Sequence, residues 1–270
     1  MRKRSTAILP SERTQVAHEV DSLNRGLELV RSFRPGESSL NITELASRTG
    51  LKRATAQRLV DTLVAHDFLE HHSDTDRYGP AVACLVLGHA YLSSAHIGHA
   101  AQPIMQALAS KYQISVALGS RDRLSMICLE LCHDHPKKDF PVSVGSSVPI
   151  TATALGRAWL WGESGTVQGE IIQRTKTEDG ELGARTIPGV YRAFQEMEEQ
   201  GYCVSFGEWI QDISAIGTVI TLQHQPSLAL SCEMARQSTH QQAMRKEDIG
   251  AALIEAASRI KHAITRQSAS

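Results

Sequence analysis

The spacing of apolar residues in the first third of the chain predicts three helices. Between residues 22 and 33, apolar side chains recur at helical intervals, and Pro35-Gly36 ends that segment. A second helix is predicted from Thr43, which we expect to cap it, to Arg48, and Thr49-Gly50 then interrupts the chain. The third is predicted from about Lys52 to His66, because its apolar residues share one face.

A hairpin and a further helix are expected next. The segments Leu69–His72 and Arg77-Tyr78 flank the polar stretch Ser73–Asp76, a pattern typical of two strands joined by a turn. From Ala81 to Ser94 the residues are mostly small and apolar, and the segment is too long for a strand. We interpret it as a connecting helix that associates with another copy of itself.

The rest of the chain mixes helices with short β-like segments. Strands are predicted at about 114–119, 124–131, 142–148, 213–221 and 228–232. Helices are predicted at about 103–111, 153–161 and 188–200, where Pro103 and Pro188 are expected to open two of them, and an apolar stripe between Ile249 and Ile264 predicts a long final helix. Helices placed irregularly among strands favour an α+β domain over a doubly wound parallel sheet.

Two short helices, a turn containing glycine and a hairpin form the layout of a winged helix-turn-helix. Four basic residues and no acidic one lie between positions 48 and 58. The first turns of a recognition helix reach base edges, where Arg and Gln pair with guanine and adenine and Lys and Thr suit phosphates. The predicted DNA-binding residues are Thr43, Arg48, Lys52, Arg53, Thr55, Gln57, Arg58 and Arg77. A solvated basic face on an ordinary three-helix bundle is the alternative.

Composition narrows the class of protein. The 270 residues are 41% apolar and 21% charged with a net charge of −1, which excludes a polycation, an acidic tail and a disordered chain but leaves a local basic surface possible. Five cysteines are too few for a disulfide framework. No stretch approaches the roughly 18 apolar residues of a membrane helix, and no signal peptide follows the basic start. We therefore expect a cytoplasmic protein that has no membrane contact and begins with a flexible extension.

Enzymatic and metal chemistry find little support in the sequence. Gly-x-Ser-x-Gly and Gly-rich phosphate loops are absent, so we expect neither an enzyme nor a cofactor. Cys128, Cys132, His133 and His135 form a compact cluster, but structural zinc sites usually pair two distant sets of ligands. No metal site and no catalytic residue are predicted. A metal-dependent or catalytic form of the second domain stays an alternative.

Several segments carry a family resemblance that covers residues 20–264. They are Ser22–Leu29, Thr43–Ala46, Arg77–Gly79, Leu87-Gly88, Val144–Ile150, Thr153–Ala158, Gly201-Tyr202 and Gly207-Glu208. The chain resembles the isocitrate-lyase-regulator (IclR) family of bacterial transcription factors. The resemblance implies an N-terminal winged helix-turn-helix, a linker helix and a C-terminal GAF-like α/β effector domain, together an α+β fold. We place these at 20–80, 81–99 and 100–266, after an extension at 1–19.

The resemblance also implies a function. Family members bind a double-stranded DNA operator as homodimers or homotetramers, and many are repressors that respond to organic acids or aromatic catabolites. We therefore expect a DNA-binding transcriptional regulator controlled by a small-molecule effector. The alternative, from a different class, is a ligand-sensing protein-interaction module whose winged helix does not bind DNA.

The effector is expected at the start of the helix near residue 153. Backbone N–H groups at a helix N-terminus attract carboxylates, and the resemblance places the effector against Ala154 and Leu155. By the same matching, the remaining wall residues are Val148, Ser205, Ile213, Ala215 and Ser231. Glu233 departs from the family pattern, which has small residues after the position of Ser231. If Glu233 faces the pocket, it repels a carboxylate, and a neutral or cationic effector becomes plausible.

Overall fold

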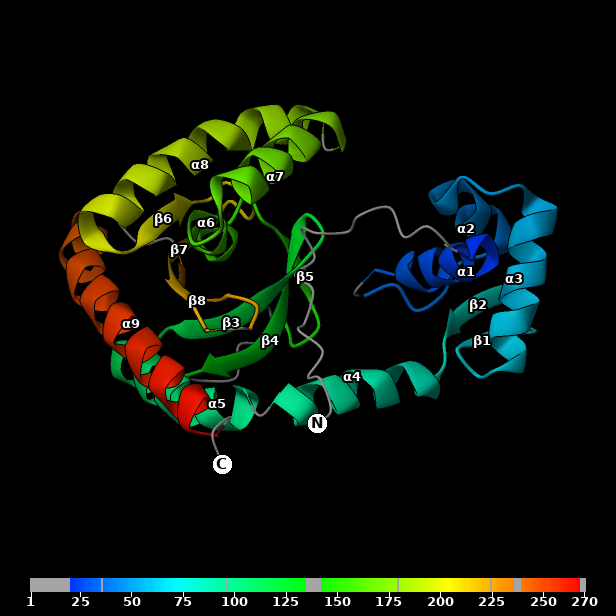
Figure 1. The fold of residues 1–270 in the computed structure, drawn as a ribbon, viewed down its shortest axis with the longest axis horizontal. Helices are drawn as coiled ribbons and strands as arrows, with labels where there is room; N and C mark the ends of the chain where they lie inside the picture. The colour runs from blue at the N-terminus through cyan, green and yellow to red at the C-terminus, as the bar shows by residue number, and fades with distance from the viewer. Residues whose placement is uncertain are drawn as a thin grey trace, which may run out of the picture. The chain divides into compact units, whose positions relative to one another are not determined.

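The computed structural model describes residues 20–34, 36–95, 97–134, 142–178, 180–223, 225–235 and 239–267. They form two compact units, of which the first ends at Ala95 and the second begins at Ile97 (Figure 1). The expected extension at residues 1–19 lies outside the described residues. The segment expected to be the linker helix belongs to the first unit as far as Ala95.

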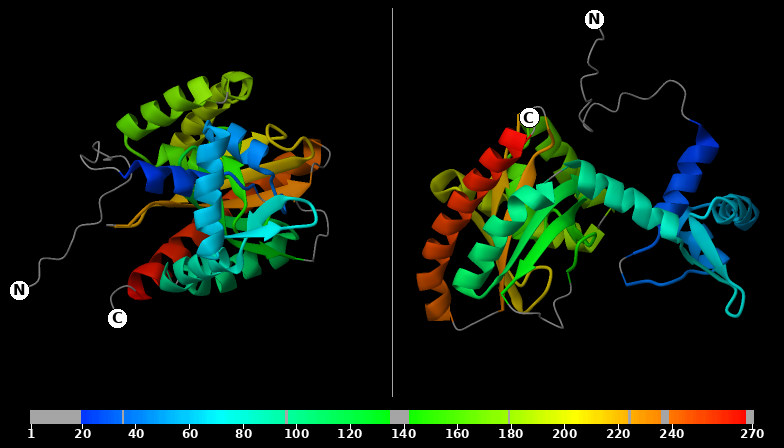
Figure 2. Two further views of the ribbon diagram at one scale, coloured as in Figure 1. Left: turned by 90° about the vertical axis from the view of Figure 1, so that its right-hand side faces the viewer. Right: turned by 90° about the horizontal axis from the view of Figure 1, so that it is seen from below.

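The first unit has the predicted order of helices and hairpin. Its elements are α1 (Asp21–Arg31), α2 (Ile42–Thr49), α3 (Arg53–Ala65), β1 (Leu69–His72), β2 (Arg77–Pro80) and α4 (Val82–Ala95). One apolar cluster joins the three helices to the hairpin, through side chains that include Leu29, Leu45, Val60 and Leu69. Figure 2 shows α3 beside the β1–β2 hairpin, which is the winged arrangement.

The cap of α2 differs from the expectation. Asn41, and not Thr43, precedes the first turn: its side-chain oxygen accepts hydrogen bonds from the backbone N–H groups of Thr43 and Glu44, both at 2.9 Å. The Glu44 carboxylate accepts a hydrogen bond from the Asn41 N–H at 2.7 Å, which completes a capping box. Gly50 ends α2 at φ +65°, a conformation that glycine adopts without strain. These caps define the turn into α3.

The second unit is a six-stranded antiparallel sheet covered by helices on both faces. Its strands are β3 (Ser115–Asp122), β4 (Ser125–His133), β5 (Ser147–Pro149), β6 (Cys203–Phe206), β7 (Ile213–Ile220) and β8 (Leu228–Ala235), in the order β5-β4-β3-β8-β7-β6. Its helices are α5 (Ile97–Tyr112), α6 (Ala154–Trp161), α7 (Gly165–Glu178), α8 (Gly180–Gln200) and α9 (Thr239–Gln267). Helices α5 and α9 cover one face, and α6, α7 and α8 cover the other (Figures 1 and 2).

Two expectations about this unit are wrong, and one of its helices was not predicted. Pro103 and Pro188 lie inside α5 and α8 and do not open them. The strand expected at 142–148 is confined to Ser147–Pro149, and α7 was not expected at all. Proline fits a helix wherever its missing N–H and its ring are accommodated, so it is a weaker boundary signal than the spacing of the apolar residues.

Candidate functional site

The exposed face of α3 carries three basic side chains at its N-terminal half. Lys52 is the N-cap residue, Arg53 and Arg58 are exposed, and Ala56 and Val60 are buried on the opposite face. Among the described residues, no carboxylate lies within ion-pair distance of Lys52, Arg53 or Arg58. This part of α3 therefore presents positive charge to solvent.

Two other predicted DNA contacts are engaged within the unit. Arg48 forms a bidentate ion pair with Glu37, with one N···O distance of 2.8 Å, and also donates to the Ser32 carbonyl at 2.9 Å. The hydrogen bonds from Arg48 lower the pKa of Glu37 to about 2. Arg77 donates to Glu44 at 2.9 Å and to the Ser39 carbonyl at 2.8 Å. Arg48 therefore connects α2 to the loop that precedes it, and Arg77 connects β2 to the same loop and to α2.

The three polar residues predicted beside these cations are placed differently from one another. Gln57 donates to Asp61 at 2.8 Å and to the hydroxyl of Tyr78 at 3.1 Å, so it connects α3 with β2 of the hairpin. Thr43 is exposed, and its hydroxyl accepts a 3.4 Å hydrogen bond from Arg53. Thr55 is half-buried. Lys52, Arg53 and Arg58 are thus the predicted cations that are exposed and form no ion pair within the described unit.

The start of α6 is packed tightly against the sheet of the second unit. Thr153 caps the helix, accepting from the Gly156 N–H at 3.1 Å and donating to the Pro149 carbonyl at 2.8 Å. A Cβ on Gly156 would lie 2.3 Å from the Ile150 Cα, and one on Gly217 of β7 would lie 2.4 Å from the Ala154 carbonyl oxygen. Both glycines are therefore required for the close approach of α6.

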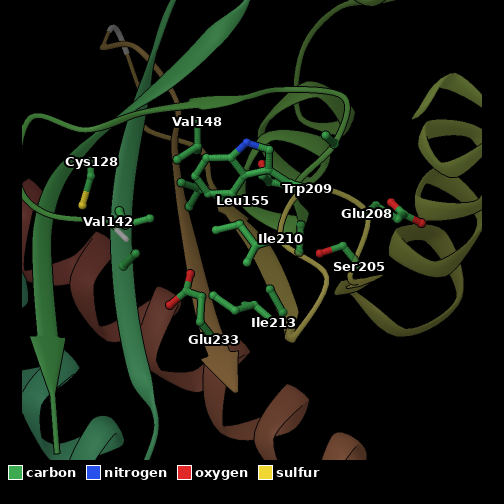
Figure 3. A pocket seen from close by; sticks show the side chains of 15 residues that line it. Cys128, Val142, Val148, Leu155, Ser205, Glu208, Trp209, Ile210, Ile213 and Glu233 are labelled. Atoms are coloured by element: carbon green, nitrogen blue, oxygen red, sulfur yellow. The ribbon is translucent and has the colours of Figure 1, made fainter. Parts of the chain in front are cut away.

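A cavity of about 50 Å³ lies between this helix start and the sheet (Figure 3). Six of the seven predicted effector residues line it: Val148, Ala154, Leu155, Ser205, Ile213 and Ala215. Ser231 does not line it. That residue is fully buried, and its hydroxyl donates a hydrogen bond to Glu233. The six residues come from β5, β6, β7 and α6, so the fold assembles a single pocket from distant segments.

Other lining residues were not predicted as site residues. They include Ala117, Cys128, Val142 and the loop residues Glu208, Trp209 and Ile210. Glu233 lines the cavity as well, which settles its orientation toward the pocket. The alternation of β3 and β4 could have indicated Ala117 and Cys128, whereas no pattern marks an irregular loop as a pocket wall.

A buried ion pair connects the pocket loop to two helices. The Arg157 side chain on α6 is fully buried, donates to the Thr151 carbonyl at 2.8 Å and pairs with Glu208. Arg192 on α8 donates to the other oxygen of Glu208 at 2.8 Å. The charge of Glu208 is therefore balanced from outside the cavity.

The two cysteines of the Cys128–His135 sequence cluster lie on opposite faces of the sheet. A bulge at Leu129 shifts the alternation of β4, so Cys128 lines the pocket while Cys132 packs in the cluster with α5 and α9. Burial, then the carboxylates of Glu233 and Glu130, raises the pKa of Cys128 to about 12, so its thiol stays protonated at neutral pH.

Of the two histidines in that cluster, only His133 is among the described residues. His133 Nδ1 lies 2.8 Å from the Ser115 hydroxyl, and His135 lies outside the described residues. Within the described ranges, no group of three or more His, Cys, Asp or Glu residues is arranged to hold a metal ion. In the same part of the chain, no helix is both long and apolar enough to cross a membrane.

Comparison with known proteins identifies the class of protein. Residues 22–73 match the IclR helix-turn-helix domain, and residues 89–262 match the C-terminal domain of the bacterial transcriptional regulator IclR. The chain belongs to the IclR family of transcriptional regulators, which confirms the predicted family and its two-part α+β fold.

Individual relatives support this assignment. The HTH-type transcriptional regulator TsaQ1/TsaQ2 of Comamonas testosteroni is 31% identical over 199 residues, which cover 73% of this chain and 71% of that protein. An IclR-family structure from Brucella abortus is 31% identical with a TM-score of 0.83, covering 92% of this chain and 95% of the other. An IclR homologue from Microbacterium hydrocarbonoxydans, solved with 4-hydroxybenzoate, shares the fold at 18% identity and a TM-score of 0.69, covering 91% and 99%. TsaQ1/TsaQ2 is a transcriptional regulator, which agrees with the expectation that this chain is not an enzyme.

Proposed function

We propose that the chain binds a double-stranded DNA operator through α3 and releases it in response to a small-molecule effector, as a repressor does. The observation that carries this proposal is the set of three exposed cations, Lys52, Arg53 and Arg58, at the N-terminal half of the second helix of a helix-turn-helix. This is the part of the motif that enters the major groove. In this proposal the ion-paired Arg48 and Arg77 have a structural role: Arg48 joins α2 to the loop before it, and Arg77 joins β2 to α2 and to the same loop.

The test is a titration of the purified full chain against DNA from upstream of its own gene, with a scrambled duplex as competitor and at two salt concentrations. Tight, sequence-dependent and salt-sensitive binding is expected, because phosphate contacts release counterions. Arg53→Ala and Arg58→Ala each abolish the preference for operator, whereas Lys261→Ala, which removes an exposed charge on α9, leaves it intact. Equal binding of operator and scrambled duplex with and without a metabolite extract favours the protein-interaction module.

A second copy of the chain is the proposed partner of α4. Val82, Leu85 and Val86 on this helix are 73%, 71% and 63% exposed, and Leu23 and Leu27 on α1 are also exposed. Apolar side chains grouped in this way mark a surface that a partner covers, and a homodimer places two recognition helices on two half-sites. Leu85→Glu is expected to shift the molecular mass measured by light scattering toward that of the monomer. Ala251→Glu, at an exposed position of α9, is the control and is expected to leave the mass unchanged.

The cavity beside α6 is the proposed effector site. Its walls are mostly apolar with a few polar groups, which is the usual composition of a small-molecule site. The related homologue bound to 4-hydroxybenzoate supports a small aromatic compound as the class of effector. A simple organic acid fits this chain less well, because the carboxylate of Glu233 lines the pocket.

Effector binding requires the pocket to open. A cavity of about 50 Å³ is far below the roughly 300–1,000 Å³ of typical ligand sites. The loop between β6 and β7 contributes Trp209 and Ile210 to the wall, and Trp209 is 38% exposed. We infer that this loop moves outward when the effector enters, and that operator affinity differs between the two positions of the loop.

A further inference from the structure

Gln57 lies in the second turn of α3, one turn beyond Arg53 on the same face of the helix. Its amide nitrogen donates two hydrogen bonds, to the Asp61 carboxylate at 2.8 Å and to the Tyr78 hydroxyl at 3.1 Å. A carboxylate only accepts hydrogen bonds, so the amide nitrogen and not the amide oxygen faces Asp61. Because an amide group has two N–H donors, both are used inside the unit.

The fold holds both acceptors of this amide in place. Asp61 lies on α3 itself, one turn after Gln57, and a hydrogen bond to a carboxylate is stronger than one between neutral groups. The ring of Tyr78 is buried in the apolar cluster of the unit and stacks on His71, with the ring centroids 4.8 Å apart. The backbone N–H and C=O of Tyr78 each form a 2.8 Å hydrogen bond with Leu40. Figure 2 shows the hairpin that carries this tyrosine beside α3. The orientation of the amide is therefore fixed before DNA is bound.

The amide oxygen of Gln57 is available to a ligand. No described residue donates to it, and unlike Arg157 Nη1 it is not a buried atom that lacks a partner, so it is accessible from solvent. A glutamine on a recognition helix ordinarily reads adenine with two hydrogen bonds, because it accepts from N6 and donates to N7. Gln57 has no free amide hydrogen to donate. It can therefore recognise only a donor.

Two bases present a donor in the major groove. These are adenine, through its N6 amino group, and cytosine, through its N4 amino group, whereas guanine and thymine present acceptors there. We infer that Gln57 is a specificity-determining residue that accepts A or C on the contacted strand of the operator and disfavours G and T. Tyr78 and Asp61 are the positioning residues that impose this choice, because they occupy both amide donors. The inference rests on the proposed function in one respect, that α3 enters the major groove.

The experiment uses the purified full chain to select preferred duplexes from a library of random sequence. The affinity for each of the four bases is then measured at every position of the selected site. One position in each half-site is expected to accept A and C about equally and to reject G and T by about fivefold or more, since a mismatched base pair typically carries such a cost. Gln57→Ala makes the four bases about equivalent at this position. Gln173→Ala, on the exposed surface of α7, is the matched control and leaves the whole profile unchanged.

Tyr78→Phe distinguishes this arrangement from an ordinary glutamine contact. The variant keeps the buried ring and removes only the hydroxyl, so one amide hydrogen becomes available to N7 of adenine. A is then expected to be preferred over C by about fivefold or more. Asp61→Ala frees the other amide hydrogen and is expected to shift the preference in the same direction. Tyr191→Phe, at an exposed position of α8, is the control. A purely structural role of Tyr78 would change stability and leave the ratio of A to C as it is.

The two proposals can fail separately. A chain that selects no sequence from the library overturns the proposed binding of an operator, and this inference with it. A chain that selects a site whose base profile Gln57→Ala leaves unchanged overturns this inference alone. The same holds if the position that responds to Gln57→Ala requires A alone, G or T in the natural sequence. An unchanged ratio of A to C in folded Tyr78→Phe and Asp61→Ala proteins overturns the positioning role of both residues.

Discussion

Glu208, in the loop that closes the pocket, forms an ion pair with Arg157, whose side chain is fully buried on α6. Arg192 on α8 contacts the same carboxylate at 2.8 Å. One side chain therefore joins the loop to both α6 and α8. A buried cation without its partner is costly, so this pair stabilises the closed position of the loop.

Glu208→Gln is expected to lower the free energy of unfolding by about 3 kcal/mol, because it leaves the buried Arg157 charge unbalanced. The measurement is denaturant unfolding followed by circular dichroism. Glu198→Gln removes a carboxylate from the exposed face of α8 and serves as control. Equal unfolding midpoints for the two variants would show that the ion pair contributes nothing to stability.

Gly189→Ala tests the same ion pair by disturbing Arg157 instead of Glu208. A Cβ at Gly189 would lie 2.6 Å from the Arg157 Cζ, so the guanidinium must move away from Glu208. We expect destabilisation of about 1–3 kcal/mol, typical of overpacking. Gly169→Ala on α7 has nothing within 4 Å of the added carbon and is expected to stabilise by up to about 1 kcal/mol. Effects of the same sign at both positions would contradict this account.

The pair between Arg48 and Glu37 predicts a pH dependence of the first unit. The folded-state pKa of Glu37 is about 2, below its ordinary value of 4.5, because Arg48 donates to the carboxylate. Its stabilising contribution is therefore present above about pH 4.5 and is lost as the pH falls toward 2. Thermal unfolding between pH 5 and pH 2 should show a weaker pH dependence for Glu37→Gln than for the natural sequence. Parallel curves would exclude a role for the pair.

Contrasting effects are expected for two arginines that sequence reasoning treats alike. Arg53→Ala removes an exposed cation from α3 and should lower operator affinity and its salt dependence while the unfolding midpoint is unchanged. Arg48→Ala removes the ion pair with Glu37 and should lower the midpoint of the first unit. Duplex titration and thermal unfolding on both variants make the comparison. The reverse pattern would assign the DNA contact to Arg48.

These two arginines show where sequence reasoning succeeds and stops. The helices and hairpin of the first unit follow from local apolar spacing, which is why their order was predictable. The pairing of Arg48 with Glu37 depends on the conformation of the loop between α1 and α2. The spacing of apolar residues does not predict that conformation. The resemblance likewise located Ala154 and Ser205 at the pocket, whereas Glu208 enters it through contact with Arg157, 51 positions earlier in the chain.

The register of the strands is a second feature that the sequence alone did not predict. The bulge at Leu129 places Cys128 and Cys132 on opposite faces of the sheet, although their spacing alone would place them on the same face. The cap of α2 is a related case, because Asn41 and Thr43 are both good cap residues and only the extended backbone at Asn41 distinguishes them.

Ala215→Leu provides the sharpest separation of ligand response from DNA binding. Ala215 lines the cavity in register with Glu233, so a leucine fills the roughly 50 Å³ that a ligand would enter. We expect the binding of small aromatic compounds to be lost, with operator affinity in the absence of ligand unchanged, because the recognition helix belongs to the other unit. Ala251→Leu on the exposed face of α9 is the matched control and should preserve both activities. If a folded Ala215→Leu protein still binds such compounds with natural affinity, the effector occupies another site.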